Sequence, residues 1–366
     1  MIRLGFYTPG IMLSGELPDV TIFTECEYVD FRLLQYDLPI LEGRYYAING
    51  AAVVTDIASL VESSMAGSPD SQLAQYTVEA TDQTGTVSQS FTVLYCNLDI
   101  NLPFIDSWLT ENFLTLTPFR RIPPDGYIYV AWYTTEKEGI MFRVYTTFLN
   151  DKGEIDTYQY VNSGNGQIAH VNDVLTQLIL VENIVAKIKE AKKIDSLTLQ
   201  SVTVRVGNRS LTFYVDQSLL GIRPFWYTNC FNVPEQLVLP RVTVEKVKTD
   251  RSLAVIGRTS QFYDVSTTKE YEVQSGPLTY DEHLQIEQML SSANVRMPWG
   301  NEMPNNETDF NAMLEILITD YTSELSDSDE KPNSVKFTWR FAENRPKTLP
   351  PYSPDIFNDK FNPTFQ

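Results

Sequence analysis

Few side chains in this sequence have the type and spacing for acid, base or nucleophilic chemistry. His170 and His283 are its two histidines, and histidine is the side chain that most often exchanges protons near neutral pH. A Ser-His-Asp triad would therefore have to use one of these two histidines. We expect both histidines to be structural, either hydrogen-bonded in the interior or solvated.

Carboxylates are abundant, and two of them at a suitable separation can hydrolyse a glycoside. The cluster of Glu324, Asp327, Asp329 and Glu330 offers oxygen ligands, but it lacks the glycine and the terminal glutamate of a Ca²⁺ loop. We expect a solvated loop here, with weak Ca²⁺ binding as the alternative. An unrecognised hydrolase stays open as a lesser alternative for the chain.

Cofactor and metal motifs are missing from the sequence. It has no Walker-type phosphate loop, no GxGxxG after a strand, no GxSxG elbow and no HExxH. Cys26, Cys96 and Cys230 are odd in number and far apart, so neither a disulfide framework nor a zinc site is indicated. We expect buried free thiols, no cofactor, no metal and no catalytic residue.

Aromatic residues make up 12% of the chain, and a platform of exposed rings could bind sugars. The candidates are Phe225-Trp226-Tyr227 and the segment from Tyr127 to Tyr133. Large aromatics at alternating positions are more often core, which is the expectation here. An extracellular glycan-binding β-sandwich protein is the main alternative function.

The overall charge limits the partners. The 366 residues carry 28 Lys and Arg against 47 Asp and Glu, a net charge of −19, which repels nucleic acid and anionic lipid surfaces. No apolar run approaches the length of a membrane span, and Met1–Pro9 does not have the pattern of a secretory signal. We therefore expect no nucleic acid, no membrane insertion, and synthesis in the cytoplasm.

Most of the chain alternates apolar and polar residues with the period of two that is typical of strands. Turn residues at Asp82–Gly85, Asn150–Gly153 and Gly207-Asn208 predict three hairpins. Tyr127–Tyr133 is apolar at nearly every position, which predicts a strand buried on both faces. The stretch Asn97–Asp125 is rich in proline and is predicted to be a loop.

Three helices are predicted among these strands. Apolar residues at helical spacing indicate one over 56–65, and a strand over 174–181 is expected to lead into another over 182–193. Thr279 and Glu282 form a capping-box pattern before a third helix. Its apolar stripe is Leu284, Ile286, Met289, Leu290 and Ala293.

The C-terminal segment differs from the rest because it is dense in proline, which disfavours strands and helices. We expect an extended arm, and aromatic side chains on such an arm give a partner large surfaces to bury. Docking on another subunit is the preferred interpretation, against packing on the chain's own body or disorder. The candidate subunit contacts are Pro350, Pro351, Tyr352, Phe357, Phe361 and Phe365.

Together these patterns predict a mainly β fold with short helices (α+β), built from consecutive β-sandwich-like domains and a Pro-rich C-terminal arm. A chain of this length is expected to form more than one domain. The expected divisions are 1–97 with one helix, 98–222, an α+β domain over 223–345, and the arm over 346–366.

Several segments of apolar and turn residues, which together span most of residues 40–345, follow one another in a familiar order. These segments are Leu41–Tyr46, Val53–Glu62, Phe91–Tyr95, Phe225–Glu235, Leu278–Glu282, Met289–Val295, Leu314–Asp320 and Val335–Ala342. Their order resembles structural proteins of tailed phages and prophages of Bacteroidetes-type bacteria. One departure is at Cys230-Phe231-Asn232, where a turn containing glycine is expected after the Phe.

The resemblance implies a non-enzymatic virion component of the tail, baseplate or head–tail connector. Such a component forms a homo-oligomer around the particle axis and contacts other tail or connector proteins. The chain would be made in the host cytoplasm and end in the virion. The resemblance assigns no catalytic residue.

Overall fold

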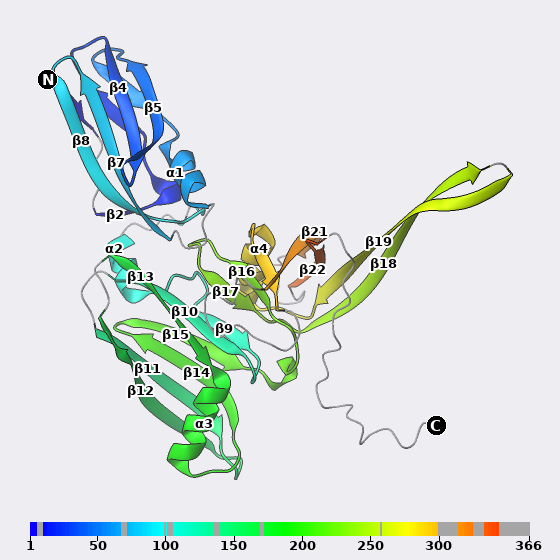
Figure 1. Ribbon diagram of the computed structural model, residues 1–366. Helices are drawn as coiled ribbons and strands as arrows, with labels where there is room; N and C mark the ends of the chain where they lie inside the picture. Colours follow the sequence, from blue (N-terminus) through cyan, green and yellow to red (C-terminus); the bar gives the residue numbers. More distant parts are fainter. Residues whose placement is uncertain are drawn as a thin grey trace.

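The structure is a computed structural model that describes residues 1–5, 10–66, 72–98, 100, 105–134, 139–168, 172–256, 258–298, 313–324 and 333–343. The described part is mainly β, with several sheets and four short α-helices (Figure 1), so the predicted fold class is confirmed. Three hydrophobic cores follow one another along the chain, and a fourth lies where the three parts meet.

The first region packs two sheets face to face. A five-stranded sheet, in the order β2-β8-β7-β4-β5, faces a three-stranded sheet, β1-β3-β6, across a core that includes Phe31, Tyr76 and Val54. Helix α1 adds Ile57, Val61 and Met65 to this core; Ile57 and Val61 are buried as their helical spacing predicted, whereas Leu60, expected on the same stripe, is exposed. The elements are β1 (Arg3–Leu4), β2 (Ile11–Leu13), β3 (Val20–Phe23), β4 (Tyr28–Gln35), β5 (Leu38–Tyr46), β6 (Ala51–Val54), α1 (Ile57–Ala66), β7 (Leu73–Asp82) and β8 (Gly85–Leu94).

The second region has a five-stranded sheet in the order β12-β11-β14-β15-β9, and the pair β10-β13 lies over it. Its two predicted hairpins are confirmed, and Gly153 has the positive φ (76°) expected of its turn. The predicted strand-to-helix order of β13 and α3 is also confirmed. The elements are α2 (Ile105–Glu111), β9 (Phe119–Ile122), β10 (Tyr127–Thr134), β11 (Gly139–Leu149), β12 (Ile155–Ile168), β13 (Asp173–Leu180), α3 (Val181–Lys192), β14 (Thr198–Val206) and β15 (Arg209–Val215).

The prediction of a loop over Asn97–Asp125 is wrong in part, because this stretch contains α2 and β9. Helix α2 is one short element of seven residues with Leu109 as its buried side chain. Strand β9 pairs in parallel with β15, which comes much later in the chain. Neither a helix this short nor a distant pairing leaves a periodic pattern in the sequence.

The third region is a seven-stranded sheet, in the order β17-β16-β20-β21-β22-β19-β18, with α4 packed against it. The capping box of α4 is confirmed: Thr279 Oγ1 accepts from the Glu282 amide at 3.3 Å, and Glu282 Oε2 accepts from the Thr279 amide at 2.9 Å. The elements are β16 (Phe225–Thr228), β17 (Pro234–Leu237), β18 (Arg241–Ile256), β19 (Thr259–Ser275), α4 (Tyr280–Ser291), β20 (Val295–Met297), β21 (Leu314–Glu324) and β22 (Ser334–Phe341).

The predicted apolar stripe of α4 is only partly right. Ile286, Met289 and Leu290 are buried, but Leu284 is half-buried and Ala293 is exposed. Ala293 lies beyond the last helical residue, so it cannot follow the helical face. The buried face instead includes the polar residues His283 and Gln285.

Strands β18 and β19 form a long hairpin that projects away from the rest of the molecule (Figure 1). The two strands are paired from Arg241 opposite Ser275 out to Ile256 opposite Thr259. Only Tyr271–Gln274 of β19 also pairs with β22, so within the described strands the outer part has no third strand.

The predicted arm, residues 346–366, lies outside the described residues, and so do all six of its candidate contacts. The division of the chain at residues 97, 222 and 345 stays a prediction.

Candidate functional site

The three regions meet at strand β10, whose two faces enter two different cores. Ile128, Val130 and Trp132 face the core of the second region, and the residues between them face the fourth core. Strand β10 is buried along its whole length, which confirms the prediction. The fourth core draws on all three regions, with Leu13, Leu94, Cys96, Leu114, Tyr129, Tyr133, Trp226, Cys230, Phe231 and Val233 among its members.

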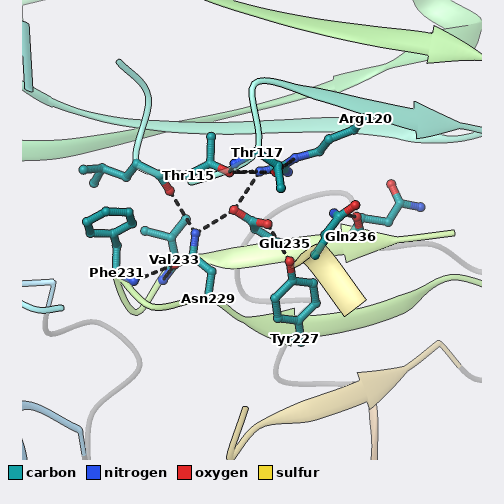
Figure 2. Close-up of polar contacts among 11 residues, drawn as sticks. Thr115, Thr117, Arg120, Tyr227, Asn229, Phe231, Val233, Glu235 and Gln236 are labelled. Carbon is teal, nitrogen blue, oxygen red and sulfur yellow. Dashed lines mark hydrogen bonds and ion pairs between the residues drawn. The ribbon is translucent and has the colours of Figure 1, made fainter. Parts of the chain in front are cut away.

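A buried ion pair lies beside this fourth core. Arg120 of β9 approaches Glu235 of β17, with 2.6 Å between Nη2 and Oε1, and the two side chains are 5% and 3% exposed. Arg120 also donates to Thr115 Oγ1 at 2.5 Å and to Thr117 Oγ1 at 3.3 Å. We call Thr115, Thr117, Arg120 and their partners Tyr227, Asn229 and Glu235 the polar joint (Figure 2).

Both oxygens of Glu235 are engaged in the polar joint. Tyr227 donates its hydroxyl to Oε2 at 2.7 Å, and Asn229 Nδ2 donates to Oε1 at 2.6 Å. Asn229 Nδ2 also donates to the Leu114 carbonyl at 2.9 Å, which ties the third region to the second. Burial, together with the adjacent Glu235 carboxylate, raises the pKa of Tyr227 well above its usual range. Tyr227 therefore stays a neutral hydrogen-bond donor.

A tight turn between β16 and β17 positions Asn229. Its side-chain oxygen accepts from the amides of Phe231 (2.9 Å) and Val233 (3.1 Å), and the Asn232 amide donates to its carbonyl (3.0 Å). Asn232 has a φ of 58°, in the left-handed region that asparagine tolerates better than most residues. Asparagine thus stands where the phage resemblance leads one to expect glycine.

The polar joint joins strands of two regions and has little free space beside it. The cavity beside it has a volume of about 10 Å³, which is room for about one water molecule. A buried Arg–carboxylate pair with its remaining hydrogen bonds satisfied clamps two elements in one geometry. Within the described ranges, no group of three or more His, Cys, Asp or Glu side chains is placed to hold a metal ion.

A second, open hollow of about 460 Å³ lies on the sheet of the second region. Arg143 and Arg205 are directly opposite each other on β11 and β14, and the Arg205 guanidinium lies 4.8 Å from the centre of the Tyr145 ring. Among the residues that the structure describes, no carboxylate, histidine or cysteine lines the hollow. Its two arginines suit contact with an anion.

The structure describes one of the two histidines and only one residue of the acidic cluster. His283 is fully buried, and its Nε2 lies 3.2 Å from Glu287 Oε1 and 3.0 Å from Ser323 Oγ, as expected of a structural histidine. His170 lies outside the described residues, as does most of the acidic cluster; only its first residue, Glu324, is included, at the end of β21.

The expected burial of the thiols holds for two of the three cysteines. All three are free, and Cys96 and Cys230 are buried in the fourth core, but Cys26 is only half-buried. The aromatic residues are core, as expected: Trp226 is 2% exposed, and Phe225 and Tyr227 are fully buried.

The sequence did not predict the polar joint. Arg120 and Glu235 are far apart in the chain, and no motif or spacing links them. The one local signal is that Glu235 is the single charged residue in the largely apolar segment from Phe225 to Leu239. A charged residue in such a run requires a buried partner, but nothing in the sequence identifies that partner.

Comparisons with known proteins add little to this geometry. No family model matches the chain, and no curated protein matches it. An I-band fragment of titin is 11% identical, over 75% of this chain and 93% of the fragment, with a TM-score of 0.19. The CBD12 segment of CALX1.2 is also 11% identical, over 52% of this chain and 87% of that one, with a TM-score of 0.18. Likenesses this distant support no conclusion about function.

Proposed function

We propose that the chain is a non-enzymatic structural protein of a tailed-phage virion, which assembles into an oligomeric component of the tail, the baseplate or the head–tail connector. The observation that carries the proposal is the contrast between a closed interior and the projecting β18–β19 hairpin. The hairpin extends well beyond the sheet to which it belongs (Figure 1). An element that leaves its own body in this way is suited to reach a neighbouring subunit.

The closed interior supports a structural role. The buried polar joint ties the second and third regions together, and the fourth core joins them to the first. Proteins of a virion shell or tube must transmit load between subunits, and buried, fully satisfied contacts resist deformation.

The two alternatives have less support. A glycan-binding surface would use exposed rings, and the rings predicted to form one, Phe225, Trp226 and Tyr227, are all buried. A hydrolase would need two carboxylates facing a space that a substrate can enter, whereas Glu235 faces a cavity of about 10 Å³.

No helix among the described residues is long and apolar enough to cross a membrane.

The test of this proposal is the composition of purified particles. Particles released from cells that carry the gene would be separated on a density gradient, and their proteins identified and counted by mass spectrometry. We expect the chain in the particle fractions at several copies per particle, and antibody labelling should place it at one end of the tail. A chain found only in the particle-free fractions would overturn the proposal.

The candidate arm contacts have a test of their own. Deleting the segment from Pro350 to Gln366 is expected to weaken oligomers more than it lowers the melting temperature of the monomer. Size-exclusion chromatography with light scattering and differential scanning calorimetry measure these two quantities. If both fall together, the segment belongs to the chain's own core.

A further inference from the structure

The β18–β19 hairpin has two faces, and we call the one on which large exposed apolar side chains gather towards the tip its apolar face. Side chains alternate between the faces along each strand, and residues paired across the ladder share a face. Leu253 pairs with Phe262, and Arg251, two residues earlier on β18, pairs with Val265. The register shifts between Ser252 and Leu253, so one extra residue of β19 is accommodated there and both pairs stay on one face.

This apolar face is open to solvent over the outer hairpin. Its exposed fractions range from 54% to 69%, although each of these side chains is large and apolar. The residues of the apolar face are Val247, Leu253, Val255, Phe262 and Val265.

The apolar face begins beside the core of the third region. Tyr271 and Val273 lie on the same face of β19, nearer its base, and they are 1% and 0% exposed. Further out, this face carries the Glu245–Lys269 ion pair and Arg251, and its exposed apolar side chains gather towards the tip. Several large apolar side chains exposed together mark an interaction site.

The opposite face of the hairpin carries charges that pair with one another, and Val242 and Val244 are exposed on it near the base. Lys246 contacts Glu272, and Lys248 lies 2.5 Å from Glu270. Exposed pairs of this kind stabilise little, and a two-stranded ribbon is at best marginally stable by itself in water. Covering the apolar face would therefore stabilise the hairpin.

Charge limits which parts of a second copy can cover it. Residues 241–275 contain six Lys or Arg and five Asp or Glu, a net charge of +1, so the rest of the chain carries −20. Residues 1–97 contain three Arg, no Lys and twelve Asp or Glu, a net charge of −9, and residues 276–345 contain five Lys or Arg and thirteen Asp or Glu, a net charge of −8. The first region is thus one of two strongly acidic parts of the chain, and its charge complements that of the hairpin.

The first region also offers apolar surface for contact. Leu38, Tyr46 and Ile48 are 70%, 65% and 76% exposed. They lie along β5 and just after it, and β5 is the last strand of its sheet. An acidic surface with an exposed apolar edge complements an apolar face that carries Arg251.

We infer that the apolar face of the β18–β19 hairpin docks on the first region, residues 1–97, of a second copy of this chain. The inference rests on the proposed role in assembly and names the surface that performs it. Because hairpin and receiving surface are different parts of the chain, the contact is head-to-tail. Repeated around an axis, such a contact closes a ring, and without closure it forms a filament.

Adjacent residues of β19 provide the test. Phe262 and Gln261 are both exposed and lie on opposite faces, since Gln261 pairs with Ala254. We expect Phe262→Asp to weaken self-association of the full chain about tenfold or more, because the variant loses the burial of a large ring. Gln261→Asp adds the same charge and should leave self-association unchanged.

Sedimentation velocity at increasing protein concentration measures self-association, and thermal melting shows that both variants stay folded. Two results would overturn the inference: a wild-type chain that stays monomeric throughout, or two variants that associate like wild type. Neither result bears on whether the chain occurs in particles, so the proposed function is judged separately.

Zero-length carbodiimide coupling identifies the receiving surface. This reagent joins lysine side chains to carboxylates, and residues 1–97 contain no lysine. In a mixture of ¹⁴N- and ¹⁵N-labelled chains, mass spectrometry distinguishes links between copies. We expect links from Lys269, which lies on the apolar face opposite Val247, to carboxylates in residues 1–97 of another copy. Links between copies that join only hairpin to hairpin would overturn the head-to-tail contact.

Discussion

The polar joint and the β18–β19 hairpin reverse the usual distribution of side chains. The joint places an Arg–Glu ion pair in the interior, at 5% and 3% exposure. The hairpin places large apolar side chains outside, with Phe262 at 54% and Val255 at 69% exposure. Each arrangement is costly in isolation, because charges favour water and apolar groups avoid it.

The difference lies in where the compensation comes from. At the joint it comes from within the chain, since Tyr227, Asn229, Thr115 and Thr117 complete the hydrogen bonds of the ion pair. At the hairpin, the described residues provide no cover for the apolar face. A buried ion pair whose hydrogen bonds are completed within the chain fixes the shape of the subunit. Apolar surface that is left exposed to water favours association with another molecule.

The strongest test of this contrast compares two adjacent arginines of β9. Arg120→Ala leaves the Glu235 carboxylate buried without its ion partner, and removing one member of a buried pair costs roughly 3–5 kcal/mol. Arg121 is 30% exposed and pairs with Asp216 and Glu282, so Arg121→Ala should cost less than about 1 kcal/mol. Urea denaturation of both variants measures the two free energies of unfolding.

A double variant separates charge burial from packing. Combining Arg120→Met with Glu235→Leu removes both charges and keeps most of the volume, so it should recover part of the lost stability, while the buried Tyr227 hydroxyl loses its acceptor. If Arg120→Ala and Arg121→Ala cost the same, the joint is not the internal clamp described above.

The second prediction concerns the alkaline limb of stability. Tyr227→Phe removes a hydrogen bond to a charged group and should cost about 1.5–3 kcal/mol at neutral pH. The pKa of Tyr227 is raised in the folded state by burial and by Glu235. Above about pH 10 the unfolded chain therefore loses this proton while the folded chain keeps it, and stability falls as the pH rises.

In Tyr227→Phe this share of the loss disappears, so the decline in stability above pH 10 should be shallower than in wild type. The decline should not vanish, because burial also raises the pKa of Tyr133 and of Tyr160 to about 12. Urea denaturation at several pH values between 8 and 11 measures the slope. Equal slopes would mean that Tyr227 is not held neutral by the joint.

Contacts between residues close together in the sequence could be predicted, and contacts between distant residues could not. Hairpins closed by Asp82–Gly85 and Gly207-Asn208 were predictable because the partner strands are adjacent in sequence. The cap of α4 lies within four residues, Thr279 to Glu282. The pairing of β9 with β15 and the contact of Arg120 with Glu235 join distant segments, and no local pattern encodes them.

The hairpin is a different case, because its strands are local but its surroundings are not. Alternation over 241–275 is compatible with two ordinary paired strands, and only the topology reveals that most of β19 has no further neighbour among the described strands. The apolar face has the same pattern as a core-facing one. Exposure depends on what packs against a strand, which its own residues do not specify.

A smaller effect is expected at the cap of α4, which packs beside the joint. Thr279→Ala removes the acceptor for the Glu282 amide and should cost about 1 kcal/mol. Thr279→Ser keeps a hydroxyl at the same place and should cost much less. Thermal unfolding compares the two variants. A large loss in both would mean that position 279 acts through packing and not as a cap.

The smallest effect on monomer stability is expected where the hairpin is shortened. Val247 and Lys269 are paired directly across the ladder, so replacing residues 248–268 by Asn-Gly closes the hairpin with a favoured two-residue turn. None of the four cores includes a residue of this segment. The free energy of unfolding should therefore change by less than about 1 kcal/mol, while self-association is lost. Urea denaturation at low concentration and light scattering at high concentration measure these quantities. A loss of several kcal/mol would show that the hairpin stabilises its own body, and the contrast with the polar joint would then be wrong.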